Sequence, residues 1–201
     1  MAETDADGGE QARGGGRPVY VPEPFRPGPR PVPPDDRILY FARDRALFGF
    51  LSHFQWAPIE LDGETWPTVE HWYQAQRSDD PAYRAAIRAA LAPGMAKRLA
   101  ASPWAPRRSS AQSWFRRNGA LPRPDWAEVK LDLMRRADRA KFVQNPPLGE
   151  ALLATGDAAL IEDSPFDEFW GTGGDGSGLN WAGRVLMEVR AALCGAPPPG
   201  G

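Results

Sequence analysis

A glycine-rich segment near the C-terminal end of the chain carries the residue types from which ligand sites are built. Between Ser164 and Asn180 it holds three carboxylates, five glycines and an indole, Trp170. Glycine lets backbone N–H groups approach a ligand closely and adopt positive φ angles. The apolar residues that follow have helical spacing, and the free N–H groups at a helix start favour anions. The segment therefore predicts a loop that binds a phosphate or a sugar, with acidic side chains beside it.

The same segment contains a literal G-x-G-x-x-G pattern at Gly171, Gly173 and Gly176. Besides a phosphate or sugar loop, this pattern could be a dinucleotide-binding fingerprint or a glycine-rich turn. A dinucleotide fingerprint requires a buried strand immediately before the glycines. The residues 167–170 do not resemble a buried strand, so this interpretation is disfavoured. A glycine-rich turn that merely permits tight packing remains the alternative.

A second candidate site lies between Trp66 and Gln76. At helical spacing Glu70, Gln74 and Arg77 share one flank of a predicted helix. A carboxylate in the first turn of a helix often only complements the helix dipole, so Glu70 is either a surface residue or a catalytic one.

The elements that must position these residues follow an α+β pattern. We expect strands over 38–41 and 159–162, and a hairpin over 58–66 with Asp62-Gly63 at its turn. We expect one helix with Val69, Trp72, Tyr73 and Gln76 on one face, and another that is capped by Asp80 and carries Tyr83, Ile87 and Leu91. A later helix is predicted to start with a capping box at Asp125 and Glu128 and to bury Trp126, Val129, Leu133 and Ala137. Residues 148–153 are predicted as a short helix and 107–124 as a long loop.

Composition divides the chain into one domain and two tails. Of its 201 residues, the first 36 are rich in Pro and Gly and lack periodic apolar residues, so 1–36 is predicted to be a disordered tail. Residues 195–201 are predicted to be a second disordered tail. Residues 37–194 are enough for a single sizeable core. The expected fold is therefore α+β, a single mostly helical domain with a small β element.

Charge and residue counts exclude several classes of protein. The formal net charge is −2, so no global basic field indicates nucleic-acid binding. One cysteine and two histidines favour neither a disulfide framework nor a metal site, and we expect no metal and no cofactor. The sequence has no apolar run long enough to span a membrane, and its N-terminal residues do not resemble a signal peptide. Both observations predict a cytoplasmic protein.

In its combined motifs the chain resembles the NADAR family, a group of small α+β proteins linked to NAD and ADP-ribose metabolism. The resemblance covers most of 38–194, in order. It includes Trp66-Pro-Thr-Val-Glu-His71, Tyr73-Gln-Ala-Gln76, Ala96-Lys97, Asp125-Trp126, Lys141-Phe142, Gln144-Asn145-Pro146, Ser164-Pro165, Asp167, Trp170-Gly171, Gly174-Asp-Gly176, Gly178, Asn180, Gly183 and Leu186-Met187. Two features depart from the family pattern: His53 stands where many members have Asn, and the stretch 102–124 is longer or divergent.

The resemblance implies hydrolysis of an N-glycosidic bond. Some members of the family act on early riboflavin-pathway intermediates and release a pyrimidine from ribose 5-phosphate, whereas others remove ADP-ribose from guanine bases. We expect the first activity, on a phosphorylated ribosyl small molecule. A hydrolase acting on ADP-ribosylated DNA or RNA and a non-catalytic module that binds ADP-ribose or NAD are the alternatives.

The resemblance also implies roles for individual residues. Glu70 is the first choice for the carboxylate that stabilises an oxocarbenium-like ribosyl centre or activates water, followed by Asp175 and Asp167. Trp126 and Trp170 are predicted to stack on the base, although Trp126 has a core role as its alternative. The other predicted substrate-binding residues are Lys97 for a phosphate, His53 as a wall of the pocket, and Gly174, Gly176, Gly178 and Asn180 at the phosphate end.

A basic cluster in the divergent stretch favours the nucleic-acid alternative. Arg107-Arg108 and Arg116-Arg117 flank Trp114-Phe115, and interleaved cations and aromatic rings suit single strands. A solvated polar insertion is the competing interpretation.

Overall fold

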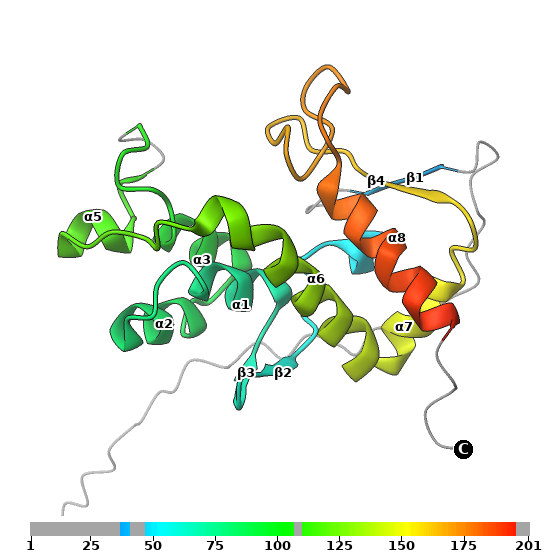
Figure 1. Cartoon of the computed structure of the whole chain (residues 1–201), viewed down its shortest axis with the longest axis horizontal. Helices are drawn as coiled ribbons and strands as arrows, with labels where there is room; N and C mark the ends of the chain where they lie inside the picture. Colours follow the sequence, from blue (N-terminus) through cyan, green and yellow to red (C-terminus); the bar gives the residue numbers. More distant parts are fainter. Residues whose placement is uncertain (1–36, 41–46, 107–109, 196–201) are drawn as a thin grey trace, which may run out of the picture.

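The computed structural model describes residues 37–40, 47–106 and 110–195 (Figure 1). The predicted tail 1–36, all of the second tail except Gly195, and Arg107-Arg108 lie outside the described residues. The elements are β1 (Arg37–Tyr40), the 3₁₀ helix η1 (Gly49–Leu51), β2 (Ile59–Leu61), β3 (Glu64–Trp66), α1 (Val69–Ala75), α2 (Pro81–Arg88), α3 (Pro93–Leu99), α5 (Trp114–Asn118), α6 (Trp126–Gln144), α7 (Pro146–Leu153), β4 (Ala159–Glu162) and α8 (Trp181–Cys194). The mostly helical α+β prediction is confirmed.

Two small sheets provide the β structure. β1 and β4 pair in parallel, with Tyr40 opposite Glu162 at their carboxyl ends. β2 and β3 form the predicted antiparallel hairpin. Asp62 and Gly63 at its turn have φ angles of 57° and 74°, the left-handed values that a tight hairpin turn requires.

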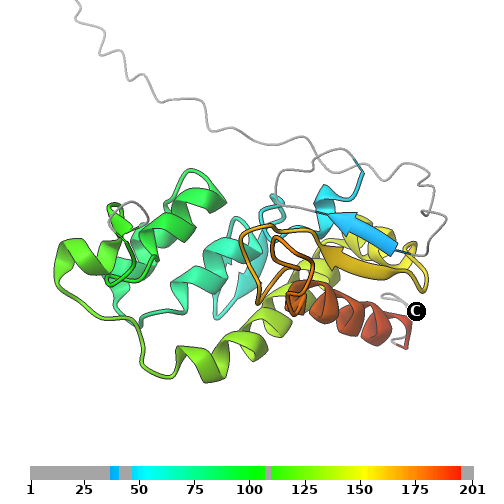
Figure 2. The same ribbon diagram turned by 90° about the horizontal axis from the view of Figure 1, so that it is seen from above.

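The long helix α6 connects the two halves of the molecule. Figure 1 shows it running between the group α1–α3 and the pair α7 and α8, and it packs against α1, α7, α8 and β2. Figure 2 shows β1 and β4 side by side next to α8, which packs on β4.

The buried face of α6 differs from the predicted one. Met134, Ala137 and Phe142 are buried, but so are Asp138 and Lys141, which are both 0% exposed. Of the predicted core residues of this helix, Trp126, Val129 and Leu133 are only half-buried. Ala137 is buried as predicted, but the apolar spacing gave no sign that Asp138 and Lys141 of the same helix are also turned inward.

Other local predictions have mixed outcomes. The Asp80 cap is confirmed, since its Oδ1 accepts hydrogen bonds from the N–H groups of Ala82 and Tyr83. The capping box at Asp125 does not form, because the Asp125 carboxylate binds the guanidinium of Arg123 instead. The predicted loop 107–124 contains the short helix α5, and the predicted core residue Leu91 is 77% exposed beyond the end of α2.

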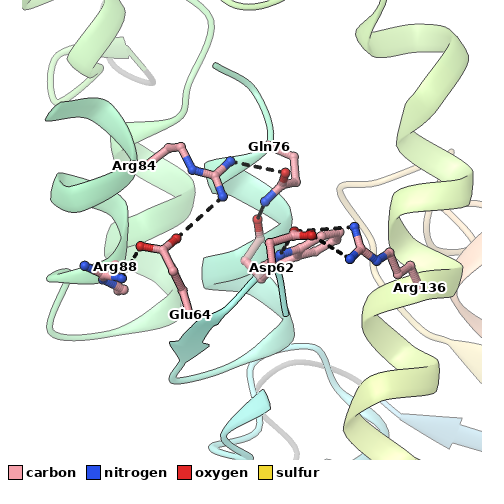
Figure 3. Close-up of polar contacts among 7 residues, drawn as sticks. Asp62, Glu64, Gln76, Arg84, Arg88 and Arg136 are labelled. Atoms are coloured by element: carbon pink, nitrogen blue, oxygen red, sulfur yellow. Dashed lines mark hydrogen bonds and ion pairs between the residues drawn. The ribbon is translucent and has the colours of Figure 1, made fainter. Parts of the chain in front are cut away.

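The hairpin links helices on its two sides through charged side chains. Figure 3 shows Asp62 pointing toward Arg136 of α6, with which it forms an ion pair at 2.6 Å. Glu64 points the other way and pairs with Arg84 and Arg88 of α2. These contacts help to fix the position of α1, which follows the hairpin directly and carries Glu70.

Candidate active site

One cavity of about 240 Å³ is enclosed by the start of α1, the first half of α6 and the segment that follows β4. It is lined by Ser52, His53, Phe54, Glu70, Tyr73, Gln74, Arg77, Lys97, Trp126, Lys130, Met134, Glu162, Asp167, Phe169 and Trp170. Six of the predicted site residues therefore lie together: His53, Glu70, Lys97, Trp126, Asp167 and Trp170. The predicted residues that do not line it are Gly174, Asp175, Gly176, Gly178 and Asn180.

Glu70 is held in the wall of the cavity by the first turn of α1. Its own N–H donates to the carbonyl of His53 at 3.2 Å, which ties the helix start to the preceding loop. Gln74 Nε2 donates to Glu70 Oε1 at 3.0 Å, and Arg77 Nε donates to Gln74 Oε1 at 3.0 Å. The predicted flank of Glu70, Gln74 and Arg77 is thus confirmed as a hydrogen-bonded row. Glu70 is only 5% exposed, so its carboxylate faces the cavity and not bulk solvent.

Glu162, which the sequence analysis did not assign to the site, is a second glutamate in the cavity. It is the last residue of β4, and burial together with the nearby carboxylates of Asp167 and Glu70 raises its pKa above the usual range, despite His53 and Lys97. A signal for it existed, because ligand sites in sheets with parallel strands gather at the carboxyl ends of the strands.

Asp167 both shapes a turn and faces the cavity. Its Oδ1 accepts hydrogen bonds from the N–H groups of Phe169 and Trp170, at 3.1 and 2.8 Å. This turn directs both rings toward the cavity. Asp167 therefore caps this turn and, as a residue of the cavity wall, is also compatible with the predicted role of a site carboxylate.

Aromatic rings form a second wall of the cavity. Tyr73 lies 4.9 Å from Trp126 and 5.7 Å from Trp170, measured between ring centroids. Trp170 in turn contacts the ring of Phe169 at 4.9 Å. The two tryptophans are half-buried, which leaves ring surface for a planar ligand.

Cationic side chains border the same space. Lys97 of α3 lines the cavity as an exposed residue. The guanidinium of Arg77 lies 4.4 Å from the Trp126 ring, and the Lys130 ammonium lies 3.3 Å from the Phe169 ring. Lys130 is half-buried, and the resulting loss of water around its ammonium lowers its pKa. These three cations balance the carboxylates of Glu70, Glu162 and Asp167 in the same cavity and offer partners for an anionic group of a ligand.

The glycine-rich loop has a structural use that differs from the predicted one. The N–H groups of Gly178, Asn180, Trp181 and Ala182 donate to carbonyls of residues 169–172. These four N–H groups are therefore already bonded within the protein and are not available to a phosphate. A Cβ at Gly178 would collide with the backbone of Thr172, so tight packing explains this glycine.

Asn180 and Asp175 are likewise engaged inside the loop. The Asn180 side chain accepts from the N–H of Glu162 and donates to the carbonyl of Leu160, both at 2.9 Å. The Asn180 amide thereby makes the kind of hydrogen bonds to β4 that a neighbouring strand would make. These bonds hold the backbone of Glu162 in place. Asp175 is exposed and accepts hydrogen bonds from the N–H and the hydroxyl of Ser177, which lower its pKa.

Within the divergent stretch, Trp114 and Phe115 pack inward, whereas Trp104 is 73% exposed. Phe115 is 0% exposed and packs on Tyr83 at 4.7 Å, and Trp114 contacts the same ring at 5.4 Å. The predicted interleaving of cations with open aromatic faces is therefore not observed for Trp114-Phe115, because both rings pack against α2.

No three His, Cys, Asp or Glu side chains among the residues that the structure describes are arranged to hold a metal ion. None of the described helices has the length and apolar character needed to cross a membrane.

Comparison with known proteins identifies the family of the chain. The NADAR domain model matches residues 40–194. The chain is 40% identical over 159 residues to the N-glycosidase YbiA of Shigella flexneri serotype 5b, which covers 79% of this chain and 89% of that protein. It is 40% identical over 158 residues to the riboflavin biosynthesis protein VVA0006 of Vibrio vulnificus, covering 79% of this chain and 39% of that longer protein. The NMR structure of YbiA from Escherichia coli matches with a TM-score of 0.63 at 38% identity, covering 79% of this chain and 86% of that one. On sequence and on structure, the chain belongs to the NADAR family.

Proposed function

We propose that the protein is an N-glycosidase that hydrolyses the bond between a ribose anomeric carbon and a nitrogen. The observation that carries this proposal is the meeting of Glu70, an aromatic wall and three cations in one cavity. The names of two relatives, an N-glycosidase and a riboflavin biosynthesis protein, support the same reaction and the same pathway. The expected substrate is a ribosylamino-pyrimidine phosphate of the early riboflavin pathway.

Glu70 performs the central chemistry in this proposal. Breaking the ribose–nitrogen bond leaves positive charge on the anomeric carbon and its ring oxygen, which a nearby carboxylate stabilises. The same carboxylate takes a proton from the attacking water. Gln74 binds Oε1 and so orients the group, while within the described residues no protein donor binds Oε2. This oxygen is the one that would face the water or the ribosyl centre.

The remaining lining residues divide between the two ends of the substrate. The half-buried rings of Trp126 and Trp170 give the pyrimidine a stacking surface, worth about 1–3 kcal/mol for each base. Lys97, Arg77 and Lys130 are the groups for the phosphate, in place of Gly174, Gly176 and Gly178, which do not line the cavity. Asp167 and Glu162 line the same cavity and are suited to ribose hydroxyls.

A product screen tests the proposal and its alternatives. Purified protein is incubated separately with a ribosylamino-pyrimidine 5-phosphate and with DNA carrying ADP-ribosylated guanine, and released ribose phosphate or ADP-ribose is measured by mass spectrometry. We expect ribose 5-phosphate from the first substrate. Release of ADP-ribose alone would transfer the proposal to the nucleic-acid substrate, and binding without any product would indicate a non-catalytic module.

A further inference from the structure

The imidazole of His53 forms a hydrogen bond with the buried carboxylate of Asp138. Its Nε2 lies 3.1 Å from Asp138 Oδ2, and the two side chains are 9% and 0% exposed. A carboxylate accepts hydrogen bonds, so Nε2 carries the hydrogen of this contact. The second oxygen of Asp138 is buried without a hydrogen-bond partner, so the contact with the imidazole is the only hydrogen bond that this carboxylate makes within the described residues. His53 also lines the cavity, and within the described residues its Nδ1 binds no protein group.

The same helix also fixes the backbone next to His53. Lys141 lies one turn after Asp138 on α6, and its ammonium donates to the carbonyl of Ser52 at 2.9 Å. The imidazole also lies nearly perpendicular to the Trp170 ring, with 6.4 Å between the ring centroids. Ring and backbone are therefore both held, which is more than a residue that only fills the wall of a pocket needs.

Charged groups from two elements act on the imidazole. Burial alone would lower the pKa of His53, but the charge and hydrogen bond of Asp138 and the charge of Glu162 outweigh burial and Lys141, so the pKa lies above its usual value. The only other histidine, His71, has a pKa below the usual value, because it is buried without a carboxylate partner. The imidazolium form is thus favoured for His53 and disfavoured for His71.

We propose that His53 is the proton donor to the departing nitrogen, and that Asp138 is a positioning residue that keeps its Nδ1–H directed into the cavity. This inference rests on the proposed function, because it supplies the proton that the reaction needs. The bond from the anomeric carbon to nitrogen breaks with its electron pair going to nitrogen, which takes the proton from Nδ1. A water oxygen bonds to the anomeric carbon, and its proton passes to Glu70. Exchange of protons with solvent restores both groups.

The pH dependence of kcat/KM on the ribosylamino-pyrimidine 5-phosphate tests the inference. A proton donor must be protonated, so the wild-type rate falls as the pH rises through the pKa of His53. That pKa is measured independently by NMR titration, in which His53→Asn assigns the two imidazole signals. Asp138→Asn removes the charge that favours the imidazolium, so both the NMR midpoint and the falling limb move together to lower pH. Asp132→Asn, an exposed position on the same helix, leaves both unchanged.

His53→Asn removes the proton, keeps a hydrogen-bond donor of similar size and installs the residue that many members of the family have here. The variant therefore tests whether this chain, unlike those members, takes the proton from a histidine. We expect kcat to fall by about 10²–10⁴-fold, with the falling limb lost and KM changed less than about threefold. An unchanged limb in Asp138→Asn, or a wild-type kcat in His53→Asn, overturns the inference. Loss of the limb only in Glu162→Gln also overturns it, and assigns the proton to Glu162.

Two further outcomes separate this inference from the proposed function. If the wild-type protein cleaves the substrate but the limb does not follow the His53 titration, only the inference fails. If the wild-type protein cleaves no ribose–nitrogen bond, the proposed function fails and the inference with it. Should His53→Asn not fold, the wild-type and Asp138→Asn titrations still decide the matter.

Discussion

Replacement of Asn180 by Ala distinguishes a structural role for the glycine-rich loop from a ligand-binding one. The Asn180 side chain makes two hydrogen bonds of 2.9 Å to the backbone of β4. Truncation leaves the N–H of Glu162 and the carbonyl of Leu160 without these partners, at about 1–3 kcal/mol for each group. Asn180 also has a φ of 51°, where Ala costs roughly 1–2 kcal/mol. Together these terms predict a loss of at least about 3 kcal/mol in the free energy of unfolding.

Urea denaturation measures this loss, and two companion variants divide it. Asn180→Gly tolerates the left-handed backbone but lacks the hydrogen bonds, so it should be about 1 kcal/mol more stable than Asn180→Ala. Ser177→Ala, in the exposed part of the same loop, should change stability by less than about 0.5 kcal/mol. If Asn180→Ala unfolds within about 1 kcal/mol of wild type yet loses affinity for ribose 5-phosphate, our reasoning is refuted and Asn180 belongs to a phosphate site.

Three further predictions concern packing, the phosphate and the hairpin. Gly183→Ala should destabilise the fold by about 3 kcal/mol in urea, because its Cβ would collide with the Leu160 carbonyl and push α8 away from β4; a neutral result would contradict that close packing. Lys97→Met should raise KM about tenfold with kcat nearly unchanged in steady-state kinetics, whereas the exposed Arg117→Met should not; equal effects of the two would remove Lys97 from the phosphate end. Arg136→Leu breaks a half-exposed ion pair with Asp62 and should cost less than about 1 kcal/mol, with the difference shrinking at high salt; a loss independent of salt would indicate packing instead.

The sequence was sufficient where local rules determine the structure. Asp62-Gly63 predicted the hairpin because its turn needs positive φ angles, and Asp80 predicted a helix start because its carboxylate binds nearby N–H groups. The row of Glu70, Gln74 and Arg77 followed from helical spacing alone.

Features that depend on distant parts of the chain were not predictable in the same way. Glu162 enters the cavity because β4 pairs with β1 and because Asn180 binds its backbone, and neither contact has a signature near residue 162. Asp138 and Lys141 have the polarity of a solvated helix face, yet their partners at residues 51–53 bring them inside. The glycine loop was assigned to phosphate on the assumption that its N–H groups are free. Carbonyls of residues 169–172 bond four of them, and this pairing cannot be recognised from the sequence.

The central claim is that Glu70 catalyses hydrolysis of a ribose–nitrogen bond in the cavity. The most direct test compares release of ribose 5-phosphate by the wild-type protein and by Glu70→Gln, which keeps the shape and removes the charge. Glu128→Gln is the matched control, since Glu128 lies in the first turn of α6, is exposed and does not line the cavity. We expect kcat to fall about 100-fold or more in Glu70→Gln, with an unchanged circular dichroism spectrum, and to stay at the wild-type value in Glu128→Gln. A folded Glu70→Gln protein that works at the wild-type rate would contradict the claim.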